Sequence, residues 1–90
     1  MNYVQETGNR IQVYLPDIDP VLLSLYTLLV FTKGVNTSLE NVHDAWACWR
    51  NLSNPHHKSL ILFDDLTEDV QELDRKYALV IRKVSSELFS

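Results

Sequence analysis

The 90-residue sequence contains one cysteine, two glycines and three prolines. A single cysteine cannot close a disulfide within the chain, so nothing indicates a small secreted domain held together by disulfides. So few glycines and prolines exclude a collagen-like, low-complexity or disordered chain. Basic residues are also few, eight against twelve acidic ones, and the formal charge is −4. This argues against nucleic acid as the main partner, because proteins that bind it neutralise phosphates with lysine and arginine.

Long apolar runs are absent. The most apolar run covers residues 21–31 and is interrupted by Ser24 and Thr27. A membrane-spanning helix needs about twenty apolar residues, so this run predicts a buried helix and no membrane partner. The N-terminus has no basic stretch followed by an apolar one, as a secretory signal would. We therefore expect a cytoplasmic protein.

The remaining composition, 46% hydrophobic and 22% charged, is that of an ordinary globular protein. Its length allows one domain, residues 1–90, with an N-terminal helical part at 1–34. Residues 2–15 are compatible with a helix that ends at Pro16, although Gly8 weakens it and residues 13–15 could be extended. Asp19 and Pro20 are typical of a helix start, and Gly34 of a helix end.

Two further helices are expected in the second half of the chain. The run Thr37-Ser38-Leu39-Glu40 has the spacing of a capping box, with Thr37 and Glu40 as its partners. The last helix is predicted over residues 67–88, since its apolar residues recur every three or four positions. Between these helices, residues 59–63 form a short apolar segment that is either extended or tucked under the loop. The sequence thus predicts a mainly α fold of three to four helices, with the last two antiparallel around a Trp/Leu/Phe core.

The helix expected around residues 21–31 is apolar on nearly every side. Such a helix must be enclosed from several directions. In a chain of this size, a second copy of the protein could supply part of that enclosure, so we expect a homodimer.

Metal binding and catalysis have little support in the sequence. His56 and His57 are adjacent, so their side chains diverge, and His43 lies on another element; this is not the spacing of a metal site. Cys48 falls late in its helix, away from the helix N-terminus that favours a reactive thiolate, and we expect it to be a small buried hydrophobic residue. We expect no catalytic residue, no metal and no cofactor, and hence no enzyme.

The third helix carries the densest group of chemically versatile side chains. His43, Trp46 and Arg50 share one face because they are spaced i, i+3 and i+7, and Trp49 lies beside them. These residues could stack on a flat base and hold a phosphate. Alternatively, an indole anchors the core, a role that suits Trp46 best, His43 packs beside Trp46 and hydrogen-bonds a neighbouring loop, and Arg50 pairs with an acid.

The run Glu40-Asn41-Val42-His43-Asp44-Ala45-Trp46-Ala47 resembles the opening motif of the ryanodine-receptor repeat, the RyR domain. The resemblance continues at His57, at Leu60-Ile61-Leu62-Phe63, at Leu66 and at Leu73-Asp74-Arg75, and covers residues 40–82 within an RyR-like core of about 37–88. The family's Gly-Trp-x-Tyr-Gly segment is missing here. Lys58 and Leu62 replace two of its prolines.

Over its full length the sequence also resembles a group of small proteins from actinobacterial phages and their hosts. The shared features include Lys33-Gly34, the run Val42-His43-Asp44-Ala45-Trp46, and Phe63-Asp64-Asp65-Leu66. This resemblance implies a phage or prophage accessory protein that acts in the cytoplasm of the host cell.

The RyR-domain resemblance implies a ligand-binding or interaction module, since an adenine nucleotide can occupy one pair of such repeats. We therefore expect a binding protein for a nucleotide or nucleotide-derived signal, acting as a sponge for a host alarm molecule. The expected ligand-binding residues are His43, Trp46, Trp49, Arg50, His57, Lys58 and Arg75. One alternative is an inhibitor or adaptor that binds a host protein through the acidic residues 64–74 or through an exposed tryptophan. Another is a minor structural phage protein.

Overall fold

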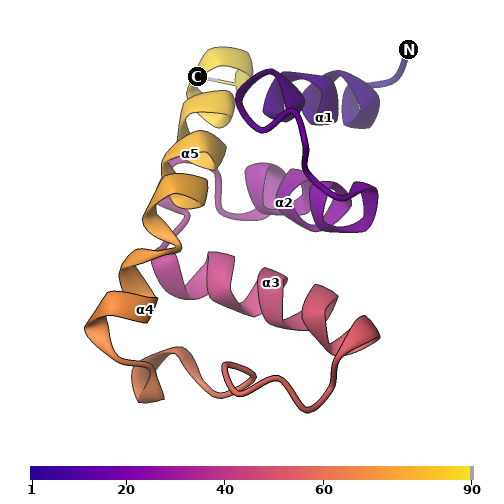
Figure 1. Ribbon diagram of the computed structural model, residues 1–90. Helices are drawn as coiled ribbons and strands as arrows, with labels where there is room; N and C mark the ends of the chain where they lie inside the picture. Colours follow the sequence, from indigo (N-terminus) through magenta and orange to yellow (C-terminus); the bar gives the residue numbers. More distant parts are fainter. Residues whose placement is uncertain (90) are drawn as a thin grey trace.

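Helix α2 lies in the middle of the fold, flanked by α1 and α3, and the long C-terminal helix α5 crosses the ends of all three (Figure 1). The computed structural model describes residues 1–89; Ser90, the last residue of the expected domain, lies outside the described residues. In chain order the helical elements are α1 (Tyr3–Tyr14), α2 (Pro20–Thr32), η1 (Gly34–Asn36), α3 (Leu39–Ser53), η2 (Phe63–Asp65), α4 (Glu68–Glu72) and α5 (Arg75–Phe89). The expected mainly α fold is confirmed.

The sequence signals at both ends of α2 act as predicted. The Asp19 carboxylate accepts a hydrogen bond from the Val21 amide at 2.8 Å, and Pro20 occupies the first turn. Gly34 ends the helix with φ +55°, a conformation that favours glycine; a Cβ there would lie 2.9 Å from the Ser85 hydroxyl. These two signals set the length of the central helix.

Gly8 does not break the first helix. It is buried in the middle of α1, where an added Cβ would lie 3.6 Å from the Thr27 hydroxyl and 3.8 Å from the Leu23 side chain. The lack of a side chain therefore allows α1 to approach α2 closely. The extended alternative for residues 13–15 is wrong, because Val13 and Tyr14 belong to α1 and Leu15 is its C-cap.

The capping box of α3 lies one residue later than predicted. Ser38 accepts from the Asn41 amide at 3.0 Å, and the Asn41 side chain accepts from the Ser38 amide at 2.9 Å. The hydroxyl of buried Thr37 instead donates to the Gly34 carbonyl, and the Thr37 carbonyl accepts from Arg82 Nε at 2.7 Å. Thr37 thereby connects the start of α3 to α5.

The single helix predicted over residues 67–88 is wrong, because the chain turns at Leu73 and Asp74 and divides it into α4 and α5. The Gln71 side chain donates to the carbonyls of Phe63 and Leu66, which holds α4 against the preceding loop. Leu73, a member of the predicted apolar stripe, is consequently 69% exposed. This break places Asp74 at a corner instead of on the surface of a continuous helix.

The segment 59–63 forms no strand. Leu62 has an extended backbone (φ −59°, ψ 146°), but its neighbours lie in turns and in η2, and no residue from 1 to 89 belongs to a sheet. The connection from α3 to α4 is therefore an irregular loop with one short 3-10 turn.

The core differs from the expected Trp/Leu/Phe core. Its buried hydrophobic members are Ile11, Leu15, Leu22, Tyr26, Val30, Val42, Ala78, Ile81 and Val84. No tryptophan or phenylalanine of the described part is fully buried. The expectation that Cys48 is buried is also wrong, because it lies on the exposed face of α3.

Helix α2 is not enclosed on every side. Val21, Leu28 and Phe31 follow one stripe of the helix and remain exposed in this chain. Tyr3 and Phe89 extend this apolar surface, with ring centres 5.1 and 5.9 Å from that of Phe31. The homodimer stays a prediction, and this stripe is the surface that it would use.

The helices are short. Within residues 1–89, none combines the length and the apolar character that crossing a membrane requires.

Candidate functional site

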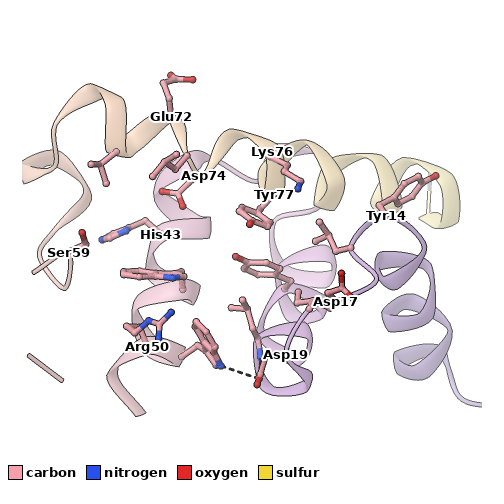
Figure 2. A pocket seen from close by; sticks show the side chains of 18 of the residues that line it. Tyr14, Asp17, Asp19, His43, Arg50, Ser59, Glu72, Asp74, Lys76 and Tyr77 are labelled. Carbon is pink, nitrogen blue, oxygen red and sulfur yellow. Dashed lines mark hydrogen bonds between the residues drawn. The ribbon is translucent and has the colours of Figure 1, made fainter. Parts of the chain in front are cut away.

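A cleft of about 1020 Å³ opens between α3 and the N-terminal end of α2, beneath the corner where α4 meets α5. The loop after α1 closes one end of it. Figure 2 shows His43 and Arg50 on α3, with Asp74 and Tyr77 reaching toward the cleft from the other side. The cleft is of the size that small-molecule sites usually have.

Arg50 lies between the two tryptophans of α3. Its guanidinium carbon is 4.4 Å from the ring centre of Trp49 and 5.9 Å from that of Trp46, which are cation–π distances. No carboxylate among residues 1–89 pairs with it, and its Nε is buried without a hydrogen-bond partner. The expectation that Arg50 pairs with an acid is therefore wrong.

The two histidines of the cleft are held in position by backbone groups. His43 Nε2 donates to the Ile61 carbonyl at 2.7 Å, and its ring stacks on Trp46 at 5.7 Å. This confirms the predicted packing of His43 beside Trp46 and its bond to a loop. His57 Nδ1 accepts from the Ser59 amide at 3.0 Å, and its ring meets Trp46 edge-on. Trp46 thus has His43, Arg50 and His57 around it.

Trp49, and not Trp46, packs against the core. Its indole N–H donates to the Asp19 carboxylate at 3.0 Å, the bond drawn in Figure 2. The same carboxylate oxygen caps α2 through Val21 and Leu22. The Asp19 side chain therefore both caps the N-terminus of α2 and connects α2 to α3 across the cleft.

Replacing Asp19 with alanine removes both interactions. We expect the free energy of unfolding to fall by about 1–3 kcal/mol, since a lost N-cap and a lost hydrogen bond each contribute about 1 kcal/mol. Thermal unfolding checks this, with Asp17→Ala as control, because Asp17 is an exposed acid of the same loop whose side chain makes no hydrogen bond within residues 1–89. Equal melting temperatures for the two variants would contradict the assignment.

The side of the cleft opposite Arg50 is formed by two tyrosines and one carboxylate. The rings of Tyr26 and Tyr77 are 5.8 Å apart, and Asp74 is close enough to Tyr26 to act on it electrostatically. Burial, with smaller contributions from Tyr77 and Asp74, raises the pKa of Tyr26. Burial also raises the pKa of Asp74, and His43 opposes this. In the described part of the chain, no group donates a hydrogen bond to the Asp74 carboxylate.

Charged groups of both signs line the cleft. The acids are Asp17, Asp19, Glu72 and Asp74, and the bases are Arg50 and Lys76. Asp19 is occupied by the helix cap and the indole, and Glu72 by Arg75. Arg50 and Asp74 are thus the two partly buried charges that lack a hydrogen-bonding partner.

The structure brings five of the seven expected ligand-binding residues to the cleft: His43, Trp46, Trp49, Arg50 and His57. Lys58 and Arg75 do not line it. Lys58 is exposed in the loop after α3. Arg75 is bound through two nitrogens to Glu72, at 2.7 and 3.1 Å, and the hydrogen bond from Arg75 lowers the pKa of that carboxyl.

Sequence reasoning missed Tyr26, Asp74 and Tyr77 as site residues. The two tyrosines fit the apolar patterns of their helices, so their hydroxyls gave no separate signal. A tyrosine within an otherwise aliphatic stripe is the feature that could have identified Tyr26, because a buried hydroxyl needs a polar neighbour. Asp74 lies in the acidic stretch 64–74, and nothing in the sequence distinguishes it from the other acids there.

Metal-binding side chains do not gather in the structure. Within residues 1–89, no three His, Cys, Asp or Glu side chains are placed so that they could hold one ion.

Comparison with known protein families matches residues 2–86 to "Domain of unknown function (DUF7701)". No curated protein and no solved structure matches the chain. The matched segment includes all of α1 to α4, most of α5 and every residue that lines the cleft. The chain therefore belongs to the DUF7701 family.

Proposed function

We propose that this protein is a non-enzymatic binding protein whose cleft takes up a nucleotide or a nucleotide-derived small molecule. The cleft volume, about 1020 Å³, is sufficient for a molecule of this size. The RyR-domain resemblance of residues 40–82 points to the same class of ligand.

The observation that carries the proposal is the unpaired guanidinium of Arg50. A charged group that loses contact with water normally gains a hydrogen-bonding partner, yet Arg50 Nε has none. The other two guanidinium nitrogens are not buried in this way and have no hydrogen-bond partner within residues 1–89, so a phosphate in the cleft would accept strong charge-assisted hydrogen bonds from them. Trp46 and Trp49 keep Arg50 from swinging freely into solvent, so the donor is already oriented.

The hydrogen bonds that His43 and His57 make to the backbone favour binding over catalysis. One ring nitrogen of His43 and one of His57 are committed to backbone groups. Cys48, the only thiol of the chain, does not line the cleft. The role we propose is to sequester a signalling molecule in the cytoplasm, as a phage-encoded sponge does to a host alarm signal.

A thermal-shift panel tests this function on the purified protein. The panel contains mono-, di- and cyclic nucleotides and isomers of ADP-ribose. A true ligand raises the melting temperature by mass action, adding about 2.7 kcal/mol of stability at a hundredfold excess over its Kd. Unchanged melting temperatures across the whole panel would overturn the proposal.

A second function is favoured by the surface formed by α4 and the loop before it. Leu62 and Leu73 are 74% and 69% exposed, and between them lie the exposed acids Asp64, Asp65, Glu68, Asp69 and Glu72. Exposed leucines among acids suit an adaptor or inhibitor that binds a basic, partly apolar protein surface. This function predicts no response to the nucleotide panel, so the same experiment separates the two.

A further inference from the structure

The two unpaired charges of the cleft have opposite signs and lie at different points along it. Arg50 follows His43 by seven residues on α3, a rise of about 10 Å along the helix. Asp74 interacts electrostatically with His43, so it lies at the His43 end of the cleft, away from Arg50. Figure 2 shows the Asp74 carboxylate above His43, and Arg50 two turns further along the same helix.

Two groups at the Asp74 end of the cleft can donate a hydrogen bond: Lys76, whose Nζ lies 5.7 Å from the ring centre of Tyr77, and His43, whose Nε2 donates to the Ile61 carbonyl. A carboxylate only accepts, and a tyrosine hydroxyl can both donate and accept. The rings of Tyr26 and Tyr77 lie 5.8 Å apart at this end, but Tyr26 is only 1% exposed, so Tyr77 offers the accessible hydroxyl. Within residues 1–89, neither Lys76 nor His43 hydrogen-bonds the Asp74 carboxylate, so this carboxylate lacks a donor.

The position of Asp74 carries an energetic cost in the empty protein. Its carboxylate is partly removed from water, which raises its pKa, and no donor compensates for the lost hydration. Asp74 lines the cleft and points into it (Figure 2), whereas Asp69 on α4 is an exposed carboxylate that does not line the cleft. The two carboxylates therefore form a natural pair for comparison.

We propose that Asp74, together with the hydroxyl of Tyr77, binds a hydrogen-bond-donating nitrogen of the ligand. This inference rests on the proposed function and specifies it: the ligand carries an amino group on a ring at one end and an anionic group at the other. The amino group donates to Asp74, and the anion accepts from Arg50. Rings that bear only carbonyl groups at the same place leave Asp74 unpaired and bind more weakly.

A matched pair of ligands tests the proposal by calorimetry. Adenosine 5′-monophosphate carries the amino group, whereas purine riboside 5′-monophosphate lacks it and is otherwise identical. We expect the wild-type protein to bind the amino compound about ten- to a hundredfold more tightly, the usual effect of one charged hydrogen bond. Asp74→Asn should reduce this preference to less than about threefold, because a neutral amide accepts a weaker bond than a carboxylate.

Two further variants separate binding from folding. Asp69→Asn removes an exposed carboxylate of α4 that does not line the cleft and should leave the preference unchanged. Tyr77→Phe removes only a hydroxyl and should lower the preference by a smaller factor than Asp74→Asn. Thermal unfolding of Asp74→Asn should match or exceed that of the wild type at neutral pH, since it removes a carboxylate that burial disfavours.

The outcomes distinguish this inference from the function on which it rests. Equal affinity of the wild type for the two monophosphates, or an unchanged preference in Asp74→Asn, overturns the assignment of Asp74 but leaves a phosphate-binding cleft. Failure of both monophosphates to bind, together with a flat thermal-shift panel, overturns the proposed function and the Asp74 assignment with it.

Discussion

Substitution of Arg50 by methionine is expected to weaken the binding of adenosine 5′-monophosphate about ten- to a hundredfold. Hydrogen bonds to a charged group contribute about 1.5–3 kcal/mol, and each 1.4 kcal/mol changes an affinity tenfold. Methionine has a similar length and can still pack between the indoles of Trp46 and Trp49. The variant thus removes the charge and its donors while keeping the walls of the cleft, and titration calorimetry measures the change in Kd.

The chain offers two matched controls for this experiment. The sequence singled out three cations as candidate phosphate ligands, but only Arg50 lies in the cleft. Lys58→Met and Arg75→Met remove the same charge at exposed positions, so each should change the Kd less than about twofold at physiological salt, where surface charges are screened. A loss in either control as large as that in Arg50→Met would place the anion outside the cleft.

The stability of the Arg50 variant separates a binding role from a structural one. Arg50 Nε is buried without a hydrogen-bond partner, which lowers the stability of the fold. The cation–π contact of the guanidinium with Trp49 offsets part of this loss. We therefore expect the melting temperature of Arg50→Met to stay within a few degrees of the wild type. A variant that unfolds much earlier would show that the guanidinium holds α3 in place.

The parts of the fold that sequence predicted well depend on local chemistry. Asp19, Pro20 and Gly34 act within one or two turns of their own position, so their meaning can be read from the sequence alone. The division of the last helix could not be read in this way. Beside the break, the Gln71 side chain donates to the carbonyls of Phe63 and Leu66, and such contacts arise only once the loop is folded.

The candidate site was predictable only where one helix supplies it. His43, Trp46, Trp49 and Arg50 could be grouped from helical spacing because they share α3. The opposite wall comes from α2 and from the start of α5, and helical periodicity carries no information about which turns of different helices face each other. Tyr26 and Asp74 are 48 positions apart in the chain, and only the packing of α5 across α2 brings them together.

The roles of the two tryptophans show the same limit. Trp46 was the better candidate for the core, yet Trp49 packs there while Trp46 is surrounded by His43, His57 and Arg50. Three residues on a helix correspond to nearly one full turn, so both indoles lie on neighbouring parts of one face. Which of them meets α2 depends on how far the loop before α2 extends, and there Asp19 binds Trp49.

Replacement of Ile81 by alanine is expected to lower the free energy of unfolding by about 2–5 kcal/mol, the usual cost of removing a large aliphatic side chain from a core. Ile81 has no exposed surface, and α5, on which it lies, packs against α1, α2, α3 and η1. Domains of this size are stable by only about 5–15 kcal/mol. Urea denaturation should therefore show a markedly lower midpoint with a similar slope.

The control for Ile81→Ala lies two residues earlier on the same helix. Leu79 is 51% exposed, and alanine is the best helix former, so Leu79→Ala should change the unfolding free energy by no more than about 0.5–1 kcal/mol. Helix α5 also supplies Tyr77 to the cleft. We expect folded Ile81→Ala to keep its ligand affinity, so that the apparent affinity falls only in proportion to the unfolded fraction. Ligand added at saturating concentration should then restore part of the lost stability by mass action. A similar loss in both variants would contradict the position of α5 across the three other helices.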